Sequence, residues 1–347
     1  MTVSDQKQFT IPGRLLTPDG ELSTAGWARQ PILDCNLEDA HFYNLGLFQP
    51  LRIKRWDYYG ITTPDHFFSF TLSDVGYLCM IFAYGIDFTT GKYHEETLTL
   101  PLGGHVQLPR NSTEGETSYS NGKVSMRFNV EPGARTLDVR WPGFGGQAFN
   151  ASVRLKHPKE HESLTIVIPI EGKRFYYNRK INCMPAEGSV EYGGQTYRLD
   201  PRTCLGNLDW GRGVWAYKSF WVWASASGFL PGGHTIGLNL GYGFGDTSAA
   251  SENAVILDGR VHKLGRVDFK YSSANFKAPW QMTSPDGRLR LEFTPFLERV
   301  AKTDALILAS EVHQMFGKYN GVVVSDEGEE IAVHDLIGFA EEHHARW

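Results

Sequence analysis

The sequence has almost none of the features of a secreted, membrane-spanning or nucleic-acid-binding protein. Its first residues, Met1 to Gln8, carry neither an apolar core nor a cleavage signature, which argues against a secretory signal. No run approaches the ~18 apolar residues that a bilayer-crossing segment needs. The formal net charge is −5 and Lys and Arg are scattered, so a partner held through its phosphates is not expected. We therefore expect a cytoplasmic protein with no transmembrane segment and no nucleic-acid partner.

Metal-binding and cofactor-binding patterns are also missing. The four cysteines lie far apart with no CxxC pair, which favours reduced thiols over disulfides or a zinc site. The segment His157 to His161 matches the zinc-protease pattern HxxEH, but that pattern requires a helix and Pro158 follows the first histidine. There is no GxSxG elbow, no Walker loop and no dinucleotide-binding glycine spacing. We expect no metal and no cofactor.

Long stretches with helical periodicity are rare, whereas glycine and aromatic residues are abundant. The chain has 37 glycines and 13% aromatic residues, and turn residues separate many short apolar runs of strand length. This pattern predicts an all-β protein built from barrels or sandwiches. The exception is the chain end, where Leu336, Phe339, Ala340, His343 and Trp347 share one helical face. We predict a short C-terminal helix there, with the run from Glu341 to His344 on its solvated side.

An internal repeat indicates two related halves. Arg55-Trp56-Asp57-Tyr58-Tyr59 resembles Phe220-Trp221-Val222-Trp223, and the run Gly91 to His94 resembles Gly259 to His262. The segments Arg127 to Val130 and Ala151 to Val153 have counterparts at Arg290 to Phe293 and Ala309 to Glu311, in the same order. We predict a first barrel-like domain over residues 1–195 and a second over residues 196–347.

The segment from Leu208 to Trp223 is the richest in aromatic residues. If the chain is extended from about Trp215, then Trp215, Tyr217, Trp221 and Trp223 project to one face. On the next strand Asn239 shares a face with two glycines, which leaves room for large rings. The rings either fill a barrel core and cover the glycines, or line a cavity for an apolar ligand. Both interpretations remain open at this point.

Two sets of ionisable residues are candidates for acid–base chemistry. Asp209 and Arg212 flank Trp210-Gly211 at the entry to the aromatic segment. A carboxyl group among indoles would have a raised pKa and could act as a general acid, whereas an Asp–Arg ion pair would only hold the turn. Further along, Glu311 and His313 alternate on one face of a predicted strand. They are either a second acid–base pair or a structural contact.

From about residue 16 to the end, the chain resembles a bacterial family catalogued as a domain of unknown function. The signatures that carry this resemblance are spread over the whole chain. They are Thr17-Pro18-Asp19-Gly20 with Gly26-Trp27, Lys54 to Tyr58, Lys180 to Pro185, Leu208 to Trp215, Glu252-Asn253-Ala254, Phe293 to Phe296 and Ser310 to Gln314.

The chain also distantly resembles the lipocalin-like group of carotenoid hydratases and plant tocopherol cyclases. In that group an Asp shortly before a Trp-Gly pair acts at or near an isoprenoid double bond. Asp209-Trp210-Gly211 looks like a shortened form of that motif, without the intervening polar residues. The resemblance implies two tandem lipocalin-like antiparallel barrels and proton delivery to an alkene, whose cationic intermediate indole faces would stabilise.

Three classes of function remain. The first is a cofactor-free lyase, hydratase or isomerase that acts on an apolar, isoprenoid-like or acyl-like substrate in an aromatic-lined barrel cavity. The second is a carrier or sensor of the same kind of molecule, and the third is a structural protein whose aromatic residues form core. In all but the third the expected partner is a small hydrophobic molecule or lipid. The predicted catalytic residues are Asp209, His313 and Glu311, and the predicted ligand-binding residues are Trp210, Arg212, Trp215, Tyr217, Trp221, Trp223, Asn239, Glu252 and Asn253.

Overall fold

The computed structural model describes residues 5–39, 41, 46–305 and 308–346, and confirms a nearly all-β chain with 63% strand and 3% helix. Short η-helices, at Leu37–Asp39 (η2), Gly46–Phe48 (η3) and Pro50–Arg52 (η4), precede the first long strand. The N-terminal segment adds β1 (Gly13–Arg14), β2 (Gly26–Ala28) and β3 (Leu33–Asp34). The remaining strands form two large antiparallel sheets.

The first sheet has the path β7-β6-β5-β4-β15-β13-β11-β10-β9-β8, with β12, β14 and β2 attached at its side. Its long strands are β4 (Ile53–Thr62), β5 (His66–Asp74), β6 (Leu78–Asp87), β7 (Lys92–Pro101), β8 (Glu116–Ser120), β9 (Ser125–Glu131), β10 (Ala134–Phe144), β11 (Gln147–Lys156), β12 (Leu164–Ile170), β13 (Arg174–Tyr192), β14 (Gln195–Leu199) and β15 (Leu205–Val214).

The second sheet has the path β19-β18-β17-β16-β24-β23-β22-β21-β20. Its strands are β16 (Lys218–Phe229), β17 (Thr235–Tyr242), β18 (Ala254–Leu257), β19 (Arg260–Lys263), β20 (Asp268–Lys270), β21 (Trp280–Thr283), β22 (Leu289–Ala305), β23 (Leu308–Val324) and β24 (Glu330–Arg346).

The two sheets follow the same plan. In each, four consecutive strands form a meander to one side, and the first strand pairs antiparallel with the last, β4 with β15 and β16 with β24. The repeated tryptophans Trp56 and Trp221 lie on these equivalent first strands. The fold therefore consists of two tandem curled antiparallel half-barrels. The chain passes from one sheet to the other between Val214 and Lys218, while a domain division at residues 195 and 196 remains a prediction.

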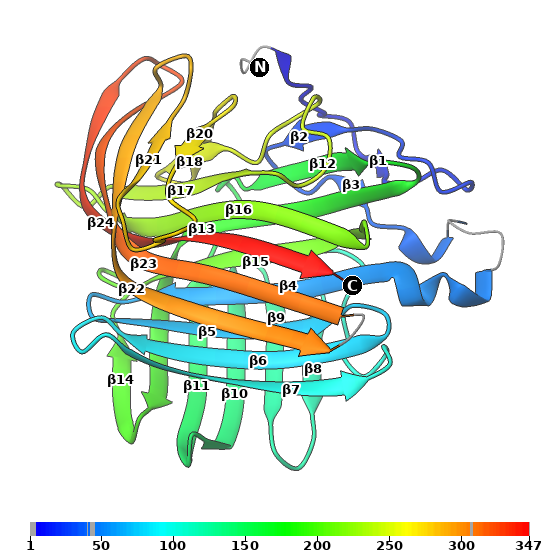
Figure 1. Cartoon of the computed structure of the whole chain (residues 1–347), viewed down its shortest axis with the longest axis horizontal. Helices are drawn as coiled ribbons and strands as arrows, with labels where there is room; N and C mark the ends of the chain where they lie inside the picture. The colour runs from blue at the N-terminus through cyan, green and yellow to red at the C-terminus, as the bar shows by residue number, and fades with distance from the viewer. Residues whose placement is uncertain (1–4, 40, 42–45, 306–307, 347) are drawn as a thin grey trace.

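Each sheet encloses its own hydrophobic core, and the two outer faces pack against each other. Tyr59 and Trp210 belong to the core of the first half, and Val222 and Ala224 to the core of the second. Because neighbouring residues on a strand point to opposite faces, Tyr58 and the tryptophans beside Val222 point into the layer between the sheets. Figure 1 shows β16 and β22–β24 crossing the middle of the molecule next to β4–β7.

A bulge in β13 locks the two sheets together. The register of β13 on β15 shifts between Ile181 and Met184, where Cys183 has a φ of 59°. The Asn182 side chain there donates to Ser225 Oγ (3.0 Å) and to the carbonyl of Ala226 (3.1 Å) on β16. These buried hydrogen bonds satisfy polar groups of both halves, so the bulge fixes the position of one sheet relative to the other.

The predicted C-terminal helix is wrong. Residues 330–346 form β24, which pairs with β23 on one side and with β16 on the other. Residues Phe339 to Glu342 are buried on both faces of this central strand, so the alternation typical of a half-exposed strand is lost. The helical spacing of Leu336, Phe339, Ala340 and His343 therefore arises because both faces of a strand carry apolar residues, and Trp347 lies outside the described residues.

Two further expectations concern the cysteines and the membrane. Cys35, Cys79, Cys183 and Cys204 are buried and free, as predicted. Within the described ranges, none of the helices is long and apolar enough to cross a membrane.

We predict that Asn182→Ala lowers the free energy of unfolding by about 1–3 kcal/mol, because it leaves Ser225 and the Ala226 carbonyl without their buried donor. Urea denaturation measures this. Asn275→Ala, at an exposed asparagine, is the matched control and should cost no more than about 0.5 kcal/mol. Equal losses in the two variants would contradict the bridging role.

Candidate functional site

A cavity of about 380 Å³ lies between the outer faces of the two sheets. Its wall includes Trp56 and Asp209 from the first half and Trp221, Trp223 and Glu341 from the second. The cavity lies beside the second barrel rather than inside it, because the inward side chains of that barrel form a packed core. The volume is within the range of about 300–1,000 Å³ found for small-molecule sites.

The strand register arranges the cavity wall in cross-strand rows. In the second sheet, Arg299 is opposite Gln314, Gln314 is opposite Glu341, and Glu341 is opposite Trp223. In the first sheet, Lys180 is opposite Asp209, which is opposite Tyr58. We call these two opposed rows the polar rows; their members are Lys180, Asp209, Tyr58, Arg299, Gln314 and Glu341.

The rows become apolar and then exposed toward one end of the cavity. The second-sheet row adjacent to the polar row consists of Ala301, Val312, His343 and Trp221. One step further, Thr303 of β22 is exposed, as are Thr97 and Thr99 of β7, and all three line the cavity. The cavity therefore opens at these threonines and has its polar rows at depth.

Aromatic rings form the middle of the cavity. The ring of Trp56 packs directly against Gly211 of β15. A Cβ atom at residue 211 would lie 1.8 Å from the Trp56 ring, so this position requires a glycine. The ring of Trp56 meets Trp215 edge to face at 4.7 Å, and Trp215 meets Trp221 at 6.0 Å. The indoles thus form a continuous apolar wall between the mouth and the polar rows.

An ion pair forms one side of the deep end. Lys180 Nζ lies 2.9 Å from Asp209 Oδ2 and 3.9 Å from Glu252 Oε2. Asn178 donates to the other oxygen of Asp209. The ammonium group also lies 3.9 Å from the centre of the Trp223 ring, a cation–π contact across the two halves. A buried lysine is thereby held by two carboxylates and an indole.

Glu341 forms the other side of the deep end, and its hydrogen-bond donors among the described residues are neutral. Trp221 Nε1 donates to one oxygen (3.2 Å) and Gln314 Nε2 to the other (3.0 Å). Burial raises the pKa of Glu341 to about 7, and the charge of Asp209 adds to this effect. A carboxyl group that exchanges its proton near neutral pH is suited to general acid–base chemistry.

A hydrogen-bonded chain extends from Gln314 into the first half. Tyr84 donates to Gln314 Oε1 (3.1 Å), and its hydroxyl lies 2.8 Å from that of Tyr58. Arg299 donates to the same oxygen of Gln314 (3.1 Å) and pairs with Glu95 at 2.8 Å. Gln314 is therefore fixed in the orientation that points its amide group at Glu341.

Glu252 reaches the cavity from the connection after β17. A Cβ atom at residue 241 would lie 2.5 Å from Glu252 Oε1, so Gly241 makes room for this carboxyl group rather than for a ring. Burial raises the pKa of Glu252, with Asp209 adding to the effect. Behind it, buried Lys263 donates to the carbonyl oxygens of Asn253 (2.9 Å) and Leu264 (2.7 Å).

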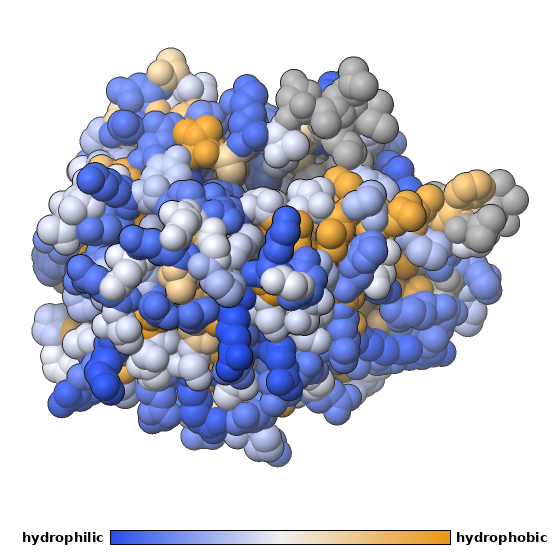
Figure 2. All heavy atoms as spheres, turned by 90° about the horizontal axis from the view of Figure 1, so that it is seen from below, coloured by the Kyte–Doolittle hydropathy of each residue, from blue (hydrophilic) through white to orange (hydrophobic). Residues whose placement is uncertain are grey.

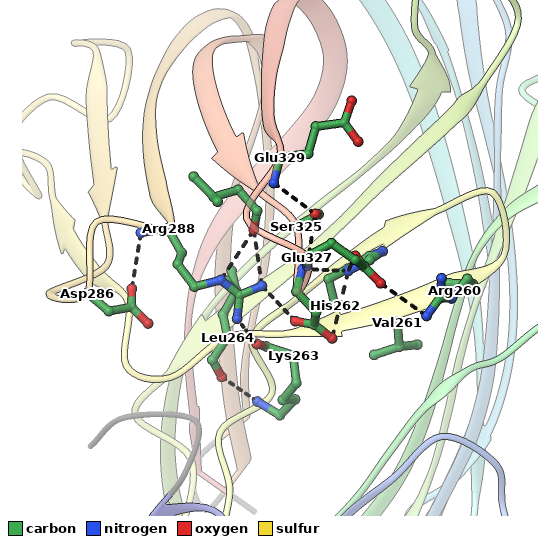
Figure 3. Close-up of polar contacts among 12 residues, drawn as sticks. Arg260, Val261, His262, Lys263, Leu264, Asp286, Arg288, Ser325, Glu327 and Glu329 are labelled. Atoms are coloured by element: carbon green, nitrogen blue, oxygen red, sulfur yellow. Dashed lines mark hydrogen bonds and ion pairs between the residues drawn. The ribbon is translucent and has the colours of Figure 1, made fainter.

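Further hydrogen bonds connect Lys263, behind the Glu252 side of the cavity, with residues nearer the protein surface. Arg288 donates to the Lys263 carbonyl (2.9 Å), in the cluster that the close-up shows (Figure 3). Arg288 also donates to Asp326 Oδ1 (2.7 Å). Ser325 and His262 belong to the same cluster. His262 Nδ1 accepts a hydrogen bond from the amide of Asp326, and Ser325 Oγ accepts one from the amide of Glu329. We interpret this cluster as structural support for the segment that carries Glu252.

His343 lies beside the aromatic wall as a neutral ring. Its ring centre is 4.0 Å from that of Trp221, and its Nε2 lies 2.8 Å from Ser310 Oγ. Burial lowers the pKa of His343 to about 3, so the ring carries no charge at physiological pH.

Five of the residues predicted from the sequence line the cavity: Asp209, Trp215, Trp221, Trp223 and Glu252. Tyr217 does not share the face of the three tryptophans, because the strand is interrupted between Val214 and Lys218 and the tyrosine side chain turns outward.

Trp210 and Arg212 point to the opposite face of β15 from Asp209. Both are buried inside the first half, where the Arg212 guanidinium lies over the Trp210 ring and pairs with Asp57 at 2.9 Å. The two residues are thus core, and Arg212 does not pair with Asp209. Asn239 and Asn253 lie behind the cavity wall, Asn239 accepting from Trp223 Nε1 (2.8 Å) and Asn253 from the amide of Gly241 (2.7 Å).

His313 and Glu311 lie on the face of β23 that points away from the cavity. His313 contacts Glu298 (2.9 Å) and Glu311 (3.3 Å), and its ring stacks on Phe276 at 4.5 Å. Strand alternation gives the cavity Gln314 and Val312 instead. A joint catalytic role for Asp209 and His313 requires both side chains to face one cavity, and they do not.

Sequence reasoning missed Glu341, Lys180, Gln314 and Arg299. Lys180 and Gln314 belong to the family signatures quoted above, and that membership could have identified them as candidate site residues. Glu341 was assigned to the solvated side of a helix. The described part of the chain holds no group of three or more His, Cys, Asp or Glu side chains placed to bind a metal ion, and His157 and His161 lie in the loop between β11 and β12.

We predict that Glu341→Gln reduces the pH dependence of stability. The folded pKa of about 7 exceeds the usual 4.5, so the stability from the bound proton is complete below 4.5 and is lost as pH rises through 7. The full loss is about 3 kcal/mol. Urea unfolding at about pH 5 and about pH 8 should show a smaller drop in the variant. Equal drops would show that Glu341 titrates normally.

Several solved structures share this fold. A protein assigned as AttH from Nitrosomonas europaea matches with a TM-score of 0.50 at 13% identity, over 84% of this chain and 92% of that one. CghA, in its structure with Sch210972, matches with a TM-score of 0.50 at 11% identity, over 96% and 97%. Kievitone hydratase from Nectria haematococca gives 0.48 at 13% identity, over 96% and 98%. At such identities the first two likenesses establish the fold alone.

The sequence itself was compared with curated proteins and with family models. The comparison with curated proteins gave no match. One family model, described as a domain of unknown function (DUF2804), matches residues 6–347. Because the match extends over nearly the whole chain, the predicted family resemblance is confirmed: the protein is a member of the DUF2804 family.

Proposed function

We propose that the protein is an acid–base enzyme, a hydratase, lyase or isomerase, that acts on a mainly apolar small molecule in the cavity between its two halves. The observation that carries the proposal is Glu341, a buried carboxyl group with a pKa of about 7 at the deep end of an indole-lined cavity. An acid of this pKa is present in both protonation states near neutral pH, as proton transfer requires.

Glu341 suits the proton-donor role better than Asp209, which the sequence favoured. Protonation of Asp209 would leave buried Lys180 without its nearest carboxylate, at 2.9 Å. Within the described part of the chain, the hydrogen bonds to Glu341 come from Trp221 and Gln314, both neutral, so a proton can be gained or lost without breaking an ion pair. In this proposal Asp209 and Lys180 orient the polar end of the substrate.

The chemistry balances with one carboxyl group and water. Glu341 gives its proton to one alkene carbon, and the neighbouring carbon becomes cationic while facing the indoles of Trp221 and Trp223. If water adds to the cation and returns a proton to the Glu341 carboxylate, the product is an alcohol. If the cation instead loses a proton from an adjacent carbon to the carboxylate, the double bond moves. Dehydration is the reverse of the first path.

The cavity favours a substrate with an apolar body and one polar group. The middle of the cavity is lined by indoles and by aliphatic residues such as Val312, whereas hydrogen-bonding groups concentrate in the polar rows. A molecule that enters with its polar group first would place the bond beside that group next to Glu341. An isoprenoid-like or acyl-like molecule with one polar group meets this description.

A carrier without chemistry is the second candidate, and the aromatic wall favours it equally. The solved CghA structure, which by its description contains Sch210972, is in keeping with a small-molecule cavity in this fold. The two candidates differ in whether the bound molecule changes.

We predict that farnesol, used as an apolar probe, quenches tryptophan fluorescence saturably. Trp221→Ala should weaken farnesol binding by about tenfold, because it removes one indole face from the middle of the cavity. The matched control is Phe229→Ala at the far end of β16, which should bind farnesol as the parent does. A non-saturable response, or equal binding by both variants, would argue against the cavity as a ligand site.

We also predict that the protein changes molecules in a lipid extract of its expression host. Incubation in water labelled with heavy oxygen should yield a compound that has gained one labelled water, or incubation in D₂O one with an exchanged deuterium. Glu341→Gln should abolish this product while leaving farnesol binding intact, because it keeps the shape of the side chain but not its proton.

The control for this experiment is Glu342→Gln, on the neighbouring residue, which bonds His344 and Tyr271 away from the cavity. It should retain the labelled product. Product formation that survives Glu341→Gln would disprove the assigned donor. Ligand capture without any labelled product in the parent protein would favour the carrier.

A further inference from the structure

Large hydrophobic side chains are exposed around the mouth of the cavity. Leu102 is 64% exposed, Phe48 53% and Tyr217 42%. Figure 2 shows hydrophobic side chains gathered in a strip on the right of the lower face, while most of the remaining face is hydrophilic. An exposed apolar group of this kind usually marks a surface that meets another apolar surface.

Leu102 and Tyr217 lie near Tyr77, which lines the cavity, and Phe48 ends η3, shortly before η4. The amide of Leu102 donates to the Tyr77 carbonyl at 2.8 Å. Arg52 and Tyr217 are both close enough to Tyr77 to influence its hydroxyl electrostatically. Arg52 ends η4 directly before β4, and Ile53 pairs with Val214, just before the connection that carries Tyr217.

Basic side chains flank this apolar surface. Arg52 and the exposed Lys218 take part in no ion pair among residues 5–39, 41, 46–305 and 308–346, and Lys218 is opposite Arg346 in the register of β16 and β24. The chain as a whole carries a net charge of −5, so a local excess of cations at the mouth is distinctive. We call this surface the mouth patch: Phe48, Arg52, Leu102, Tyr217 and Lys218.

We propose that the mouth patch docks on a lipid bilayer that contains anionic lipids, so that apolar ligands pass from the bilayer into the cavity. Exposed Phe, Leu and Tyr side chains enter the headgroup boundary, and Arg and Lys are attracted to anionic headgroups. The patch lies at the mouth of the cavity, which favours a bilayer over a protein as the partner. A docked protein would close the mouth, whereas a bilayer holds molecules that are poorly soluble in water and can supply them to the cavity. This docking rests on the proposed binding of an apolar ligand in the cavity and not on its chemical conversion.

The test is co-sedimentation of the full chain with vesicles of phosphatidylcholine alone and with about one third phosphatidylglycerol. Binding to the anionic vesicles should be about tenfold stronger and should fall as salt is added. The double variant Phe48→Ser/Leu102→Ser should lose about tenfold of that binding, and Lys218→Glu a similar amount. Phe229→Ser, at the opposite end of β16 and 37% exposed, should bind as the parent does.

Farnesol binding in solution should be unchanged in all of these variants, which shows that they are folded and separates this test from that of the proposed function. Equal binding to neutral and anionic vesicles, no binding to either, or the same affinity for the patch variant and Phe229→Ser would overturn the proposal. So would a dimer without vesicles that the double variant abolishes, since the patch would then contact a second copy of the chain.

Discussion

The central strands of this protein are buried on both faces, and the site follows from that constraint. All ten residues of β15 are buried, so its two faces serve different layers. Trp210 and Arg212 complete the core of the first half, while Asp209 and the glycines beside them turn toward the second half. Side chains on a strand can point to only two faces. The polar residues on the outer faces are therefore enclosed where the two sheets meet, and they form the polar deep end of a cavity between two apolar cores.

The enclosed charges determine the chemistry that the cavity can support. Four carboxyl groups line it, those of Glu95, Asp209, Glu252 and Glu341, and their cationic neighbours at depth are Lys180 and Arg299. An excess of buried carboxyl groups is least costly when some of them hold a proton, which agrees with the raised pKa values of Glu252 and Glu341. The same burial that makes this arrangement costly for stability therefore provides a proton donor.

The sequence predicted the fold class and the duplication, because these depend on local pattern, and it singled out Asp209 and the tryptophans that line the cavity. It did not locate the cavity, since Lys180, Asp209 and Glu341 come together only through the packing of two sheets. Glu341 was assigned to a helix because β24 is buried on both faces and lacks strand alternation. His313 was an equally reasonable candidate as Gln314, and only the register of β23 shows which of the two faces the cavity.

The most direct test of this account is the titration of Glu341 itself. Isotope-edited infrared spectroscopy of the carboxyl band, assigned by its loss in Glu341→Gln, measures the protonation state of this one group in the folded protein. A midpoint near pH 7 is expected. A midpoint near the usual 4.5 would mean that the group is ionised and hydrated at neutral pH, and would contradict an enclosed acid at the junction of the two halves.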